Sequence, residues 1–260
     1  MDKKNNLTII LCWFLVFGLL FGLYGCGTIS KIGSQLTSRL EKEVSKKADK
    51  EEEEDLATLL REAERLFNRG SYDLAYEYYK KISDMYPGSP QAILAELRMA
   101  DSKFWAGEYL EALSLYESFE KFYPNNEAIP YVIFQIGTCY YKLKLSYDRD
   151  QSYAKKAIET YERLLQNYPK SPYRAEAAKR IKELREQLAT HEFYVAQFYY
   201  KLGYYRAAYN RVLYILNNFS GTNIYQQAQK VAPLYYQKAL LETKELAEGT
   251  KKDFWGDRFP

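Results

Sequence analysis

The sequence predicts an all-α protein, a curved solenoid of about five helical hairpins stacked side by side. The phrase Gly-x-Tyr-x-x-Ala occurs three times, starting at Gly70, Gly107 and Gly203. Each copy is followed by an aromatic residue and a helix breaker, namely Tyr86-Pro87, Tyr123-Pro124 and Phe219-Ser220. Nothing between residues 55 and 247 shows the alternating pattern of a strand.

Each element of this repeat has a mechanical interpretation. Gly readily adopts the left-handed conformation that ends a helix, so it separates the two helices of a hairpin. Pro cannot continue a helix and ends the second one. Small residues allow the two helices to cross closely, and they occur upstream of each turn at Ala63, Ala100, Gly137 and Ala196. We therefore expect a repeat domain over residues 55–247, with N-terminal units over about 55–128, C-terminal units over about 129–247 and a tail over 248–260.

This unit resembles the tetratricopeptide repeat, which has small residues in both helices, an aromatic residue in the second and Pro at its end. Ser89-Pro90 and Ser171-Pro172 are expected to start helices, with Ser as the N-cap and Pro at the first helical position. An insertion near residues 145–151 replaces the turn of the third unit. Residues 172–202 form either one long helix or two joined near His191, and a last helix over about 222–247 is expected to be interrupted at Pro233.

The amino terminus is predicted to be a lipoprotein signal peptide over residues 1–25. Lys3 and Lys4 precede an uncharged run over residues 7–25, and Cys26 follows Leu23-x-Gly25. This order is typical of a secretory signal, and its end resembles the bacterial lipobox, which implies lipidation of Cys26. An uncleaved transmembrane anchor is the alternative, because nineteen apolar residues can span a bilayer. Residues 26–54 are charged and are interpreted as a flexible tether.

Composition argues against several kinds of function. The formal net charge is +3, and removing residues 1–25 takes away two Lys and one Asp and leaves +2, so nucleic acid is not an expected partner. Cys139 is the only Cys of the repeat domain and is predicted to be a buried apolar side chain. No nucleophile motif, phosphate loop or metal-ligand spacing appears. The sequence therefore predicts no enzyme, no metal and no cofactor other than lipid on Cys26.

The central and C-terminal units resemble the BamD family, a lipoprotein component of the outer-membrane β-barrel assembly machinery. The phrases that carry this resemblance are Asp148-Arg149-Asp150-Gln151, Tyr168-Pro169-x-Ser171-x-Tyr173, Leu188-Ala189-x-His191-Glu192, Val195-Ala196-x-Phe198-Tyr199 and Gly203-x-Tyr205-x-Ala207-Ala208-x-x-Arg211. The resemblance implies a scaffold at the outer membrane that faces the periplasm and helps to insert β-barrel proteins. The expected partners are a BamA-like barrel subunit, other assembly-machinery lipoproteins, unfolded barrel proteins and the membrane. A periplasmic repeat adaptor of the Tol-Pal or cell-division type is the alternative.

The resemblance also implies two sets of site residues. Those expected to contact the barrel subunit are Arg211, Tyr205, Asp148 and Arg149. For Arg211, a local surface ion pair is the alternative to a partner contact. The inward positions of the first helices form a predicted groove for an aromatic-rich client peptide, namely Asn68, Asp101, Trp105, Tyr131 and Tyr141. Packing between repeats or ordinary solvent exposure is an equally good interpretation of these positions, and it is favoured for the neighbouring Phe134.

Overall fold

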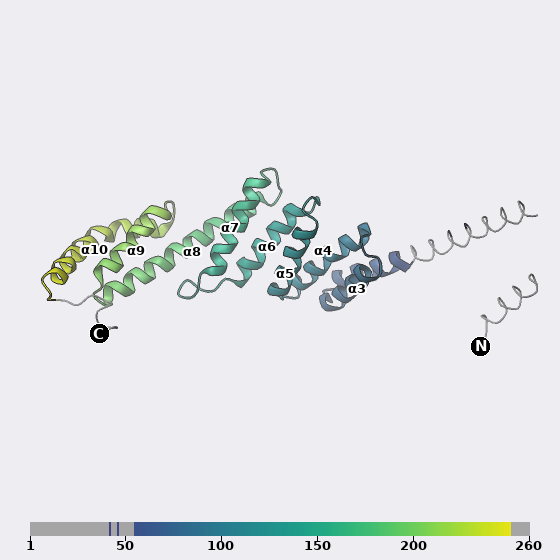
Figure 1. Ribbon diagram of the computed structural model, residues 1–260, viewed down its shortest axis with the longest axis horizontal. Coiled ribbons are helices and arrows are strands. Elements are labelled where there is room, and N and C mark those ends of the chain that lie inside the picture. Colours follow the sequence, from purple (N-terminus) through teal and green to yellow (C-terminus); the bar gives the residue numbers. More distant parts are fainter. Residues whose placement is uncertain (1–41, 43–45, 47–54, 251–260) are drawn as a thin grey trace, which may run out of the picture. The chain divides into compact units, whose positions relative to one another are not determined.

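The computed structural model describes residues 42, 46 and 55–250 of the 260-residue chain (Figure 1). The predicted signal peptide, Cys26, nearly all of the tether and residues 251–260 of the tail lie outside the described residues. The chain divides into two compact units, residues 1–58 and 59–260, and the repeat domain falls largely in the second. Among the described residues, no helix has both the length and the apolar content needed to cross a bilayer.

The described part of the chain is helical and contains no strand, which confirms the predicted all-α class. Residues 55–68 are helical and lead through Gly70 into the next helix. The helices that follow are α3 (Tyr72–Met85), α4 (Pro90–Trp105), α5 (Tyr109–Phe122), α6 (Ile129–Leu143), α7 (Ser152–Asn167), α8 (Arg174–Lys201), α9 (Tyr205–Asn218) and α10 (Asn223–Ala247). Each packs on the next along the chain, and α10 also packs on α8. This order of contacts is that of stacked hairpins.

The three repeated glycines end helices as predicted. Gly70, Gly107 and Gly203 have φ angles of +79°, +85° and +79°, which side chains with a Cβ rarely adopt. The amide after each glycine donates to a carbonyl five residues back, and for Gly107 this bond joins Glu108 N to Lys103 O at 3.0 Å. Such a bond satisfies a carbonyl that the helix end would leave unpaired. The repeated phrase is therefore a helix stop followed by a helix start.

The breakers end the second helices as predicted, but only one of the two Ser-Pro pairs starts a helix. α3, α5 and α7 end just before Tyr86, Tyr123 and Tyr168, each of which precedes Pro. The Oγ of Ser89 accepts a bond from Ala92 N at 3.0 Å, with Pro90 in the first turn. The same prediction for Ser171 is wrong. There the Oγ accepts from Tyr173 N at 3.3 Å, so the residues form a turn and α8 begins at Arg174.

Two predictions about long helices are resolved. Residues 174–201 form the single helix α8, with no break near His191. The expected interruption at Pro233 is wrong, because α10 runs continuously through it. Pro233 lies on the exposed side of α10, where the carbonyl deprived of its amide partner can bond to water. The buried side chains of Ala228 and Tyr235 hold the helix to its neighbours on both sides of this position.

The core repeats one arrangement of a small residue against a ring. Ala63, Ala100 and Ala196 are fully buried. At the corresponding place in α6, a Cβ added to Gly137 would lie 2.6 Å from a ring carbon of Tyr161. The rings that fill the gaps between neighbouring helices come four residues after the small residue of each second helix, as Tyr79, Tyr116 and Tyr161.

Cys139 is buried as predicted, and burial raises the pKa of its thiol to about 12.

Candidate functional site: an aromatic surface above a buried carboxylate

Asp101 of α4 is the centre of a polar network inside the stack. Its Oδ1 accepts hydrogen bonds from the hydroxyls of Tyr116 on α5, at 2.6 Å, and of Tyr131 on α6, at 2.7 Å. Arg98 donates to its other oxygen at 3.1 Å. Gln135 in turn donates to the Tyr131 hydroxyl at 3.0 Å. The network therefore joins three consecutive helices through one carboxylate.

The prediction that the Asp101 side chain lines a groove, where a client peptide could touch it, is wrong. Its side chain is only 2% exposed, because three donors enclose it. Burial, together with the Asp101 charge, raises the pKa of the Tyr131 and Tyr116 hydroxyls, so both remain protonated donors at physiological pH. Asp101 acts instead as an anchor that fixes the position of Tyr131.

Four half-buried rings lie close to this anchor, namely Tyr131, Phe134 and Tyr141 of α6 and Tyr173 before α8. Together with Arg180 of α8 they form what we call the aromatic surface. The rings of Phe134 and Tyr173 are stacked, with centroids 5.0 Å apart and planes 19° apart. Tyr131 also contacts Tyr173, at 5.7 Å. The predicted groove residues Tyr131 and Tyr141 thus belong to one surface.

Arg180 supplies the positive charge of the aromatic surface. Its guanidinium carbon lies 5.0 Å from the ring centroid of Phe134 and 5.2 Å from that of Tyr141. Its Nη1 donates to Thr138 Oγ1 at 2.7 Å and to the Tyr161 hydroxyl at 2.9 Å, and its Nε donates to Glu176. These contacts hold the guanidinium plane in place. Rings beside a fixed cation can bind an extended segment that carries aromatic side chains and a negative or carbonyl group.

The remaining predicted groove residues lie in other hairpins. Trp105 is 57% exposed at the end of α4, where its ring stacks on Tyr72 with centroids 6.5 Å apart. Asn68 is exposed in the preceding helical segment, close to the Gly70 turn. Asn68 and Trp105 therefore belong to the turn edge of the N-terminal hairpins. The contacts of the aromatic surface are made instead by residues of α6, Tyr173 and α8.

The insertion between α6 and α7 is held against α8. Gln187 of α8 donates to the carbonyl of Leu145 at 2.8 Å and to the side-chain oxygen of Gln151 at 2.7 Å. Gln151 also donates to two carbonyls of the insertion itself. The ring of Tyr147 meets that of Tyr194 edge to face at 5.8 Å. The insertion is therefore a fixed part of the surface of α8.

The predicted partner-binding residues lie around the same stretch of α8. Asp148 and Arg149 are exposed in the insertion, and a bond from Ser146 lowers the pKa of the Asp148 carboxyl. Arg211 of α9 donates to Glu192 of α8 at 2.8 Å. This is the local ion pair that the sequence offers as the alternative to a partner contact. Tyr205 contacts Tyr200 edge to face at 5.1 Å. We call the insertion, residues 187–194, Tyr205 and Arg211 the α8 surface.

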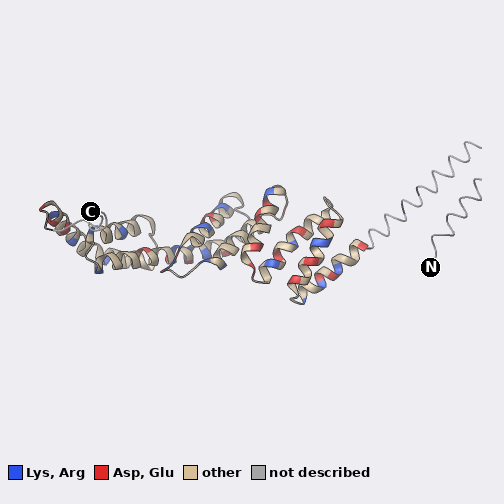
Figure 2. Ribbon diagram, turned by 60° about the horizontal axis from the view of Figure 1, so that its bottom comes forward, with Lys and Arg blue, Asp and Glu red and all other residues tan. Residues whose placement is uncertain are grey.

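Charge alone does not single out either surface. Figure 2 shows acidic and basic residues interspersed along the described helices. What distinguishes the aromatic surface is its rings, and sequence reasoning missed two of its members, Tyr173 and Arg180. Tyr173 belongs to the phrase Tyr168-Pro169-x-Ser171-x-Tyr173, which indicates the family but no role in a binding surface. Arg180 had no local signal, because a long helix with many charged residues gives no indication of which one meets a ring from α6.

The geometry defines a class of protein: a scaffold of stacked helical hairpins whose surfaces suit the binding of other chains. A model of the YfiO family, described as outer membrane lipoprotein, matches residues 52–252. The chain belongs to this family, which confirms the resemblance inferred from its sequence.

Curated relatives carry the name outer membrane protein assembly factor BamD. The protein from Rickettsia prowazekii is 29% identical over 192 residues, which cover 74% of this chain and 69% of the relative. The protein from Caulobacter vibrioides is 25% identical over 135 residues, or 52% of this chain, and the match spans only 44% of that relative's length. A solved tetratricopeptide repeat protein from Parabacteroides merdae has a TM-score of 0.38 and 16% identity, covering 76% of this chain and 68% of the other.

Proposed function

We propose that this chain is an outer-membrane assembly factor, a scaffold subunit of the β-barrel assembly machinery that catalyses no reaction. The observation that carries this proposal is the family match over residues 52–252, together with relatives named as assembly factors. The proposal places the chain on the periplasmic side of the outer membrane, held by lipid on Cys26. No observation favours an adaptor of the Tol-Pal or cell-division type.

In this proposal the aromatic surface receives client chains. A barrel protein that has not yet folded presents extended segments in which aromatic side chains alternate with polar ones. Such a segment can place its rings on Phe134, Tyr141 and Tyr173 without first forming a regular structure. The guanidinium of Arg180 lies close enough to these rings to pair with a carboxylate or a carbonyl of the same segment.

Replacing Tyr141 with Ala tests the client surface. The ring is half-buried and its hydroxyl donates to Glu183 at 2.9 Å, so its loss removes one wall of the surface without emptying the core. We expect a synthetic peptide of alternating aromatic and polar residues to bind the full chain about three- to tenfold more weakly, as befits the loss of one aromatic contact. Fluorescence anisotropy of the labelled peptide measures this change. Tyr214→Ala, which removes an exposed ring of α9, is the matched control, and equal binding by both variants would contradict the client surface.

The α8 surface is proposed to dock the BamA-like barrel subunit and, through it, the other lipoproteins of the machinery. Its exposed members carry both charges, Asp148 and Arg149 from the insertion and Arg211 from α9. Because α8 holds all of these elements, the surface is already formed before a partner arrives. Preformed surfaces lose less entropy on binding than flexible ones.

Arg211→Glu is expected to reduce copurification of the barrel subunit from solubilised envelopes by about tenfold, because a negative charge beside Glu192 would replace a cation at the interface. Arg163→Glu is a matched control. Arg163 also pairs with a glutamate of another helix, Glu120, and the side chains of Arg163 and Arg211 are 41% and 43% exposed. The two reversals should therefore disturb the fold alike. If both variants copurify the barrel subunit equally, Arg211 does not belong to the docking surface.

A further inference from the structure

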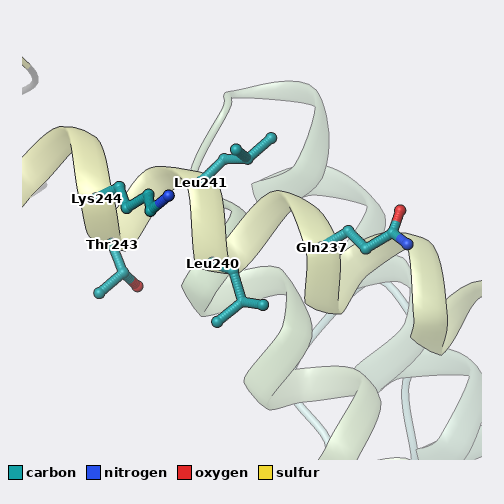
Figure 3. Close-up of a pocket in the computed structure, with 5 residues that line it drawn as sticks. All are labelled: Gln237, Leu240, Leu241, Thr243 and Lys244. Carbon is teal, nitrogen blue, oxygen red and sulfur yellow. The ribbon is translucent and has the colours of Figure 1, made fainter.

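Hollows on the described helices differ in how many helices wall them. The hollow drawn in Figure 3 has a lining that comes from α10 alone, namely Gln237, Leu240, Leu241, Thr243 and Lys244. Because a single helix is convex, this hollow is an open helix face and defines no ligand. A second hollow, which we call the three-helix pocket, is walled by α7, α8 and the carboxyl-terminal end of α9. Only the three-helix pocket has walls on several sides, as a binding site requires.

The floor of the three-helix pocket is apolar, and its size suits one side chain. Ile158 of α7, Leu188 of α8 and Phe219 at the end of α9 line the floor and are buried. The pocket has a volume of about 210 Å³. An apolar cavity of about 150 Å³ already holds one benzene ring, whereas pockets for whole small molecules measure about 300–1,000 Å³. The pocket is therefore large enough for one aromatic side chain and too small for a cofactor.

The rim of the three-helix pocket is charged. Lys155, Glu159 and Glu162 occupy positions i, i+4 and i+7 of α7 and therefore share one face of that helix. Arg185 of α8 completes the rim. None of these side chains forms an ion pair with another residue of the described chain. Their charges are therefore available to a ligand that enters the pocket.

The balance of these charges favours a cation in the ligand. Arg185 Nη2 donates to the carbonyl of Asn218, the last residue of α9, at 2.6 Å, and its guanidinium lies 5.8 Å from the ring centroid of Phe219. Because the carboxyl-terminal end of a helix carries partial negative charge, it offsets much of the Arg185 charge. Glu159 and Glu162 then outnumber the one remaining lysine. Glu162 is also half-buried, so water screens its charge less than it screens a fully exposed one.

We propose that the three-helix pocket binds an extended segment of a partner protein in which an aromatic residue is followed, two residues on, by Lys or Arg. The ring buries apolar area on the floor of the pocket, as the anchor residues of protein interfaces do. Residues two apart in an extended segment point to the same side, so the cation reaches Glu159 and Glu162 at the rim. The pocket shares only the buried Leu188 with the α8 surface and nothing with the aromatic surface. This inference does not rest on the proposed assembly role.

Peptides of defined sequence test the ring and the cation separately. The probe is the acetylated and amidated pentapeptide Gly-Phe-Gly-Lys-Gly, and in two further versions Gln replaces its Lys or Ala replaces its Phe. The full chain in lipid nanodiscs is labelled at its Ile and Leu methyl groups and titrated by NMR. We expect the probe to shift the methyl resonances of Ile158 and Leu188 and to leave those of Ile82 in α3 unchanged. The Gln and Ala versions should bind about threefold and about tenfold more weakly, because they lack the ion pair and the ring, respectively.

A double variant shows whether the two glutamates hold the cation. Glu159→Gln with Glu162→Gln should weaken binding of the probe about threefold and leave binding of the Gln version unchanged. A general loss of structure would weaken both peptides alike. The matched control is Asp73→Asn with Glu77→Gln, two exposed acids of α3, which removes the same charge and should leave both peptides unaffected.

Three results would overturn the proposal. The first is that the probe does not shift the methyl resonances of the pocket, and the second is that it shifts only those of other helices. The third is that the native chain binds the Lys and Gln versions equally, which would remove the cation from the proposed ligand.

Discussion

Asp101→Ala is expected to lower the free energy of unfolding by about 2–4 kcal/mol, because it leaves buried hydroxyls without their acceptor. The loss is large because two buried hydroxyls and the guanidinium of Arg98 would lose their shared acceptor at once. A group left buried without a partner costs its full desolvation. Urea denaturation followed by circular dichroism measures the change.

Companion variants separate the buried network from a general effect of removing a carboxylate. Adding Tyr116→Phe to Asp101→Ala should recover part of the loss, because the donor that lacks an acceptor is also removed. Asp84→Ala, which removes a carboxylate paired with Lys80 at the surface, should leave the stability nearly unchanged. A stability of Asp101→Ala indistinguishable from that of Asp84→Ala would show that the network does not hold α4, α5 and α6 together.

Gly137→Val is expected to destabilise the protein by about 3 kcal/mol, at the upper end of the cost of overpacking a core. The first added carbon would already lie 2.6 Å and 2.8 Å from two ring carbons of Tyr161. That ring cannot swing aside easily, because it is fully buried and its hydroxyl is bonded to Thr138 and Arg180. The midpoint of thermal unfolding reports the change.

Two variants test whether the ring causes this effect. Ala178→Val places the same side chain on an exposed face of α8 and should cost only the small helix propensity of Val. In the background of Tyr161→Leu, the additional effect of Gly137→Val should shrink, because the obstructing ring is gone. Strictly additive effects in the double variant would show that α6 and α7 do not meet at this point.

Features set by neighbouring residues were predictable from the sequence. Gly107 takes a left-handed conformation because glycine has no Cβ, and Tyr86 ends a helix because Pro follows it. Ser89 and Ser171 have the same local signal, yet only Ser89 caps a helix. The sequence around Pro233 likewise indicated a break, whereas packing on both sides of it keeps α10 continuous.

Features set by contacts between distant helices were not predictable. Asp101 was correctly placed on a first helix, but its burial depends on hydroxyls fifteen and thirty residues away. Arg180 meets Phe134 only because its long side chain reaches from α8 to α6, two helices that are each packed on α7. No periodicity in a single segment contains this information, since it depends on the offset between two helices. The candidate site was therefore found in part, at Tyr131 and Tyr141, and completed only by the tertiary structure.

The length of α8 has a mechanical consequence for the whole scaffold. Arg180, near its start, belongs to the aromatic surface, and Gln187, seven residues on, carries the insertion. Seven residues of helix span about 10 Å and behave as a stiff rod. The spacing between the guanidinium and the insertion is therefore set by one helix and not by a loop. The two surfaces therefore share one continuous helix as their common support.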